Sequence, residues 1–156
     1  NIIISKKMKN KTLLLFTVIF LGISMIGCST LLKKNKSQNK PLIGTYWSLE
    51  KVNQNKVPDI GNTPYILFSE TGNFNGIASC NKYFGTFILN KKTIAIENTG
   101  ATKKMCANME LEKIYFGALK KEINYYKIMG DTLILFERNK EVLRYIAKEN
   151  PSNSNE

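Results

Sequence analysis

The chain contains no histidine among its 156 residues. Without histidine there is no Ser–His or Cys–His pair that activates a nucleophile, and no imidazole that binds a metal ion. The sequence also has no glycine-rich phosphate-binding loop, and its acidic residues do not form the pairs that glycosidases use. We therefore expect a protein that is not an enzyme and that needs no cofactor and no metal.

One enzyme-like pattern remains, because Ser79-Cys80-Asn81-Lys82 fits the S-x-x-K nucleophile motif of penicillin-binding enzymes. The chain is too short for that fold, and it has neither of the partner motifs K-T-G and S-D-N. The motif also follows a predicted strand instead of opening a helix. We therefore do not interpret it as a nucleophile site.

Cysteine is scarce as well, and the first of the three cysteines, Cys28, has a distinctive context. It follows a basic cluster at Lys6–Lys11 and an apolar run at Leu13–Met25. A positive region, a short apolar region and a small residue before the cleavage site, here Gly27, are typical of a secretory signal peptide. A cysteine directly after that residue resembles the bacterial lipobox. We predict a signal peptide over residues 1–27, with Met8 as its conventional start, and lipidation of Cys28.

A transmembrane helix is the alternative for the same apolar run, but the run is shorter than the roughly 20 residues that span a bilayer. Several acyl chains on Cys28 would anchor the chain firmly, because each buried CH₂ contributes about 0.8 kcal/mol. The expected location is therefore the cell envelope. Ser29 stands where Asp would favour retention in the inner membrane, so we expect the outer membrane, facing the periplasm. In a host with one membrane the anchor would lie in that one.

The formal charge of +11 is unevenly distributed. Eight of the 23 basic residues lie before Pro41, where the sequence has no acidic residue, which leaves 15 basic and 12 acidic residues and a charge of +3 from Pro41 onward. Lysines beside an anchor are attracted to anionic lipid headgroups. Because the excess charge lies at the signal peptide and beside the anchor, we expect a membrane as a partner and no nucleic acid.

Composition divides the rest of the chain into three parts. Residues 28–40 are a polar tether after the lipidated cysteine, residues 41–148 are long enough for one domain with a hydrophobic core, and residues 149–156 are a polar tail that we expect to be disordered.

Alternating apolar and polar residues, bounded by turn residues, predict eight strands in the domain. They are Thr45–Val52, Tyr65–Phe68, Phe74–Ser79, Tyr83–Leu89, Thr93–Ile96, Tyr125–Met129, Thr132–Glu137 and Val142–Ala147. Apolar residues at helical spacing predict a helix over Met109–Lys121, with Asn108 as its N-cap. The order of five strands, one helix and three strands predicts an α+β, mostly β fold. We expect an antiparallel sheet of about eight strands, curled into an open barrel, with the helix packed against it.

Three motifs follow one another in this domain. They are Leu42–Leu49 (LIGTYWSL), Gly76–Gly85 (GIASCNKYFG) and Ala101–Ala107 (ATKKMCA), after which Glu110 opens the predicted helix. In this order they resemble the META domain family, whose pattern runs roughly G-x-W-x-L, G-x-x-G-C-N-x-y-x-G, T-x-M-x-C and then an acidic residue. Ser79 replaces the commoner glycine before the cysteine. The resemblance extends from Leu42 to Ile146.

The resemblance implies a small β-barrel-like domain with one helix and no shared enzymatic activity. It also implies kinship with HslJ-like heat-shock lipoproteins and structural similarity to pilotins, which escort other envelope proteins. We therefore expect an envelope stress or assembly factor that acts by binding a protein partner. The alternative is a carrier or sensor of a small apolar molecule, a lipid or an antibiotic, held in the barrel.

Two cysteines remain if Cys28 is lipidated, and an even pair in an oxidising compartment predicts a disulfide between Cys80 and Cys106. Two buried thiols or a redox-active pair are the alternatives. The other residues of the motifs are expected to be structural, with Trp47 in the core and Asn81 as a turn or capping residue. The remaining motif residues are Gly76 and Gly85, at bends or bulges of the sheet, together with Thr102, Met105 and Glu110.

Overall fold

The computed structural model of the chain describes residues 38–58, 61–107 and 109–151, which fall within one unit. The predicted signal peptide, Cys28 and most of the tether lie outside the described residues, as does Asn108. Nothing in the structure therefore bears on the lipidation of Cys28.

The described residues form nine strands and one helix. The strands are β1 (Tyr46–Val52), β2 (Asn55–Lys56), β3 (Tyr65–Phe68), β4 (Asn73–Ile77), β5 (Lys82–Asn90), β6 (Thr93–Ala101), β7 (Ile123–Met129), β8 (Thr132–Glu137) and β9 (Lys140–Lys148), and the helix is α2 (Glu110–Leu119).

Eight of the strands form one antiparallel sheet in the order β6-β5-β4-β3-β1-β9-β8-β7, and the short β2 pairs with β1. The sheet curls so that its two edges approach each other. The Tyr126 N–H donates to the Lys92 carbonyl oxygen (3.3 Å), and the Tyr126 hydroxyl donates to that of Lys91 (3.3 Å). The predicted fold, an open barrel of about eight strands with one helix, is confirmed.

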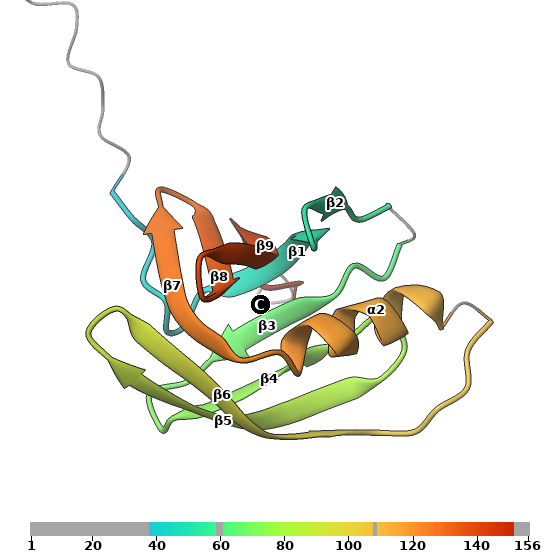
Figure 1. Cartoon of the computed structure of the whole chain (residues 1–156). Helices are drawn as coiled ribbons and strands as arrows, with labels where there is room; N and C mark the ends of the chain where they lie inside the picture. The colour runs from blue at the N-terminus through green and yellow to red at the C-terminus, as the bar shows by residue number, and fades with distance from the viewer. Residues whose placement is uncertain (1–37, 59–60, 108, 152–156) are drawn as a thin grey trace, which may run out of the picture. The chain divides into compact units, whose positions relative to one another are not determined.

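Helix α2 lies between the two halves of the curled sheet (Figure 1). Its buried face carries Leu111, Tyr115 and Leu119, at the spacing of an amphipathic helix. The predicted N-cap is wrong, because the N-cap residue is Met109, whose side chain makes no capping hydrogen bond. The first turn instead directs the Glu112 carboxylate inward.

Two strands differ most from the sequence-based expectation, and most of the others differ from it by one or two residues at their ends. The two-residue β2 was not predicted, because it depends on a tight turn in which Asn53 and Gln54 both adopt positive φ (48° and 71°). Strand β6 continues to Ala101, beyond the predicted Ile96, although its second half is polar. An edge strand is half solvated, so polar residues do not end it.

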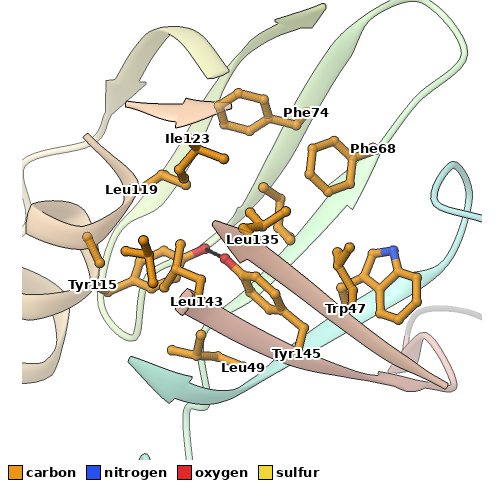
Figure 2. Packing of buried hydrophobic residues seen from close by; sticks show 14 of the residues in the cluster. Trp47, Leu49, Phe68, Phe74, Tyr115, Leu119, Ile123, Leu135, Leu143 and Tyr145 are labelled. Atoms are coloured by element: carbon orange, nitrogen blue, oxygen red, sulfur yellow. Dashed lines mark hydrogen bonds between the residues drawn. The ribbon is translucent and has the colours of Figure 1, made fainter. Parts of the chain in front are cut away.

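The interior of the curled sheet is filled by large side chains from both halves and from α2 (Figure 2). The largest fully buried ones are Trp47, Phe68, Phe74, Tyr83, Tyr115 and Tyr145. Close packing of this kind leaves little room for a ligand between the layers.

Three buried tyrosine hydroxyls form a directed chain of hydrogen bonds in this core. Figure 2 shows the link between Tyr115 and Tyr145. The Tyr83 hydroxyl donates its hydrogen bond to the Tyr65 carbonyl oxygen (2.8 Å), so it accepts a hydrogen bond from the Tyr115 hydroxyl (2.5 Å). Tyr115, having donated, accepts from Tyr145 (3.0 Å). Each buried hydroxyl is thereby satisfied, which removes the cost of burying it.

Burial raises the pKa of all three tyrosines, because the phenolate would lose its hydration in the core. The pKa of Tyr115 is raised to about 12, and those of Tyr83 and Tyr145 lie well above the ordinary value of 10.0. A group whose pKa is raised on folding stabilises the folded state fully below its unfolded pKa. This stabilisation is lost as the pH rises from the unfolded pKa to the folded pKa.

We predict that the free energy of unfolding is independent of these tyrosines below pH 10 and falls above it, by roughly 1 kcal/mol per pH unit for each tyrosine. The unfolded chain ionises there while the folded core stays protonated. Urea unfolding at several pH values between 8 and 11.5 measures the slope. Tyr145→Phe removes the first donor of the chain and one titrating group, so its slope should be shallower. An unchanged slope in that variant would contradict the prediction.

Candidate functional site

The second and third sequence motifs meet at one end of β5, and a disulfide joins them. It links Cys80, before β5, to Cys106, after β6, with their Cα atoms 6.2 Å apart. Closing a loop of 26 residues contributes about 3 kcal/mol in the chain-entropy picture. The disulfide that the sequence predicts is present, so neither residue offers a free thiol.

Asn81 holds the segment after β6 through its side-chain amide, which is only 2% exposed. The Asn81 Oδ1 atom accepts from the Thr102 hydroxyl and from the Lys104 N–H, both at 2.7 Å. The Nδ2 atom donates to the Lys104 carbonyl oxygen (3.1 Å) and to the Glu112 carboxylate (2.7 Å). All four hydrogen-bonding positions of the amide are used, which fixes its orientation.

Glu112 connects this cluster to α2 and is 4% exposed. Its Oε2 atom accepts the backbone N–H groups of Asn81 (2.7 Å) and Cys80 (3.1 Å), and its Oε1 atom accepts the Asn81 amide. A carboxylate that accepts three N–H bonds is strongly held, because bonds to a charged acceptor are about twice as strong as neutral ones.

The carboxylate of this site is therefore Glu112, whereas the sequence motif pointed to Glu110. Glu110 is exposed, and among the described residues its carboxylate has no hydrogen-bond partner. A signal for Glu112 existed, because it lies on the apolar stripe of the helix with Leu111, Tyr115 and Leu119. An acidic residue on a buried stripe needs partners, and the sequence did not reveal which groups supply them.

Met105 has an unexpected position, because it is 90% exposed although it lies in a family motif. Its two neighbours are both held, Lys104 by two backbone hydrogen bonds to Asn81 and Cys106 by the disulfide. The thioether side chain is thus displayed on a fixed segment, next to the exposed Lys103 and Lys104. Burial in the core does not explain this methionine.

Trp47, Gly76 and Gly85 lie in the sheet and not at this cluster. Trp47 is buried, and its indole N–H donates to the Leu42 carbonyl oxygen (2.9 Å). A Cβ at Gly76 would collide with the Tyr65 carbonyl oxygen, and one at Gly85 with the Phe74 ring. Gly85 also sits at a register shift between β5 and β6, so it marks a bulge.

Ser79 adopts φ +91°, in the region that favours glycine. The family pattern most often has glycine at this position, and the backbone geometry gives the physical reason. The left-handed conformation costs a residue with a Cβ about 1–2 kcal/mol. The neighbouring cluster therefore holds the Ser79 backbone in a strained conformation.

The site displays an exposed side chain on a segment that hydrogen bonds and a disulfide hold in place. Among the described residues no group of three His, Cys, Asp or Glu side chains is placed to hold a metal ion. In the described part of the chain, no helix has the length and apolar character that crossing a membrane requires.

A hollow of about 1160 Å³ lies elsewhere, at the β8–β9 turn, and is open and lined by charged residues such as Lys51, Arg138 and Arg144.

We predict that Glu112→Ala lowers the free energy of unfolding by roughly 2–4 kcal/mol, because it leaves three N–H donors without an acceptor, two of them on the buried Asn81. Glu110→Ala, two residues away in the same turn, removes only an exposed carboxylate and should change stability by less than about 0.5 kcal/mol. Urea unfolding of both variants makes the comparison. Equal effects of the two substitutions would show that Glu112 does not hold this cluster together.

Ser79→Gly is expected to stabilise the fold by about 0.5–1 kcal/mol. The glycine removes the strain of the left-handed backbone conformation in the folded state. It also raises the conformational entropy of the unfolded chain, which cancels part of the stabilisation. Ser79→Ala keeps the strain and should give no gain, which separates the backbone from the hydroxyl. Thermal unfolding measures both, and a glycine variant no more stable than the alanine variant would refute the explanation.

Comparison with known proteins agrees with the observed fold. The sequence pattern of the META domain matches residues 40–150 of this chain. No curated protein is significantly similar to it in sequence. Among solved structures, an NMR structure is 27% identical with a TM-score of 0.53, and the match covers 65% of this chain and 87% of that chain.

Two further structures share the fold. An NMR structure of a protein from Burkholderia xenovorans is 22% identical with a TM-score of 0.56, covering 70% of this chain and 85% of that one. A crystal structure of a duf4847 family protein from Bacteroides vulgatus is 16% identical with a TM-score of 0.52, and the match covers 70% of this chain and 96% of that chain. The match over residues 40–150, together with the curled antiparallel sheet and its single helix, shows that the chain belongs to the META domain family.

Proposed function

We propose that this chain is a lipid-anchored protein of the cell envelope that acts by binding another envelope protein, in a stress or assembly role. The META domain family is not known as a family of enzymes. The observation that carries the proposal is the position of Met105. An exposed apolar side chain on a segment held from both sides is a feature of a binding surface, because little conformational entropy is lost when a partner covers it.

The surroundings of Met105 indicate which partner would fit. Lys103 and Lys104 are exposed beside it. Methionine is flexible and polarisable, and it serves well at surfaces that accommodate different apolar side chains. We therefore expect a partner segment that combines an apolar side chain with acidic residues.

The proposed anchor rests on the sequence before the domain. The apolar run, Gly27 and Cys28 have the order of a lipoprotein signal. Among the described residues, the first member of the hydrophobic core is Leu42. We propose the outer membrane, facing the periplasm, as the location, and the absence of aspartate after Cys28 supports it.

A carrier of a small apolar molecule is less well supported. The space between the sheet and α2 is occupied by Tyr83, Tyr115 and Tyr145, whose hydroxyls bond to one another. An apolar ligand would have to displace them and break these buried hydrogen bonds, at a cost in stability.

A photo-cross-linking amino acid in place of Met105 should form one discrete adduct with an envelope protein when the full chain is expressed in its own host. The same amino acid in place of Met129, which is exposed on β7, serves as the matched control and should not give that adduct. Gel mobility and mass spectrometry identify the product.

The disulfide provides a second control for this experiment. Cys80→Ser combined with Cys106→Ser frees the segment around position 105, so the yield of the adduct should fall several-fold while circular dichroism shows that the sheet persists. Absence of an adduct at position 105, or the same adducts at positions 105 and 129, would refute binding through this surface.

A further inference from the structure

The tether enters the domain at the β7–β8 turn. The Gly130 N–H donates to the Asn39 side-chain oxygen (2.7 Å), and the Lys40 N–H donates to the Gly130 carbonyl oxygen (2.8 Å). These two bonds fix the last residues of the tether against one end of β7. The first described residues accordingly lie beside β7 in Figure 1, whereas the segment between β6 and α2 lies at the other side of the domain.

The point where the tether enters decides which end of the domain lies nearest to the proposed anchor. In the sequence only 11 residues separate Asn39, which is bound at the β7–β8 turn, from Cys28. Strand β5 has nine residues and a length of about 30 Å, and Cys80 and Cys106 lie beyond its first residue, Lys82. The chain is therefore attached at the β7–β8 turn, and the disulfide segment lies at the far end of β5.

A second hairpin adds lysines to the same end. The bonds from Tyr126 to the carbonyl oxygens of Lys91 and Lys92 hold the β5–β6 turn against β7. We name the residues at this end the tether-end surface. It consists of Lys40, Lys91, Lys92 and Lys127, with the exposed apolar residues Ile88, Leu89 and Met129.

The charge of the tether-end surface is positive. Asp131 is the acidic residue at the β7–β8 turn, and Lys148 and Glu149, which line a hollow beside Lys40, offset each other. The four lysines and the one remaining acidic side chain, Asp131, give this surface a net charge of +3. Three further lysines, Lys33, Lys34 and Lys36, precede this end in the tether.

The apolar residues among the lysines complete the pattern. Ile88 is 57% exposed and Met129 is 44% exposed. Basic residues surrounding exposed apolar side chains are the combination that binds at the headgroup region of an anionic bilayer, where the cations meet lipid phosphates and the apolar groups enter the acyl boundary.

We propose that the tether-end surface lies against the anionic lipid headgroups of the membrane, so that the domain has a defined orientation with Met105 directed away from the bilayer. The inference rests on the proposed lipid anchor for its location. The surface itself carries the chemistry that recognises the lipid. An oriented domain presents the Met105 segment to partners in the aqueous compartment, whereas a freely rotating one would hide it part of the time.

The test measures binding of the mature chain, produced from residue 28 onward without residues 1–27 and with Cys28→Ala so that it carries no lipid, to vesicles that contain 30% phosphatidylglycerol in phosphatidylcholine. The triple variant K91Q/K92Q/K127Q should bind at least tenfold more weakly. The matched control K103Q/K104Q/K113Q removes the same charge from exposed lysines at the other end and should change the affinity by less than about twofold. Near-ultraviolet circular dichroism checks that both variants are folded. Equal losses in the two variants, or equal binding to pure phosphatidylcholine, would overturn the proposal.

A fluorescence measurement adds a readout of contact. Met129→Trp should show a blue-shifted emission on anionic vesicles, and Met105→Trp should not, while the buried Trp47 gives a constant background in both. A shift at position 105 and none at 129 would reverse the proposed orientation. Incorporation of labelled palmitate into the native chain, lost in Cys28→Ala, tests the anchor separately. A labelled chain with no selective loss in K91Q/K92Q/K127Q would refute only the surface, and an unlabelled chain would refute only the anchor.

Discussion

The buried carboxylate of Glu112 constrains much of this fold. It accepts the backbone N–H groups at the start of β5 and the amide of Asn81, and Asn81 in turn binds both backbone groups of Lys104. One charged group thus joins α2, the β4–β5 connection and the segment after β6. A buried charge is tolerated only when its hydrogen bonds are satisfied, so these three segments have to adopt this arrangement together. The exposed position of Met105 follows from that requirement.

The tyrosine chain imposes a similar condition on the core. Tyr83 comes from β5, Tyr115 from α2 and Tyr145 from β9, and their hydroxyls donate in one direction toward the Tyr65 carbonyl oxygen. Apolar packing alone would allow the helix to shift along the sheet at little cost. Polar groups buried in a fixed order specify one position, because every shift leaves a hydroxyl without a partner. A filled and specified interior suits a protein that binds partners on its outside.

The sequence predicted the parts of this structure that depend on local patterns. Alternation and turn residues gave strands β3 and β8 with their observed bounds, and the cysteine pair gave the disulfide. It did not predict what depends on contacts between distant residues. Asn81 and Glu112 are 31 residues apart, and nothing near either one indicates the other. From the sequence we therefore expected Glu110 instead of Glu112. We also expected a structural role for Met105, whose side chain the structure exposes.

The contact between the two ends of the sheet has a consequence for solubility. Strands β6 and β7 are the edges of the sheet, and an edge with unpaired backbone groups is a template on which another chain can add a strand. The bonds from Tyr126 to Lys91 and Lys92 bring these edges together and cover part of both. The lipid anchor that we propose would concentrate copies of the chain in two dimensions, so encounters between them would be frequent. Closing its own edges in this way protects the domain against edge-to-edge aggregation with its neighbours.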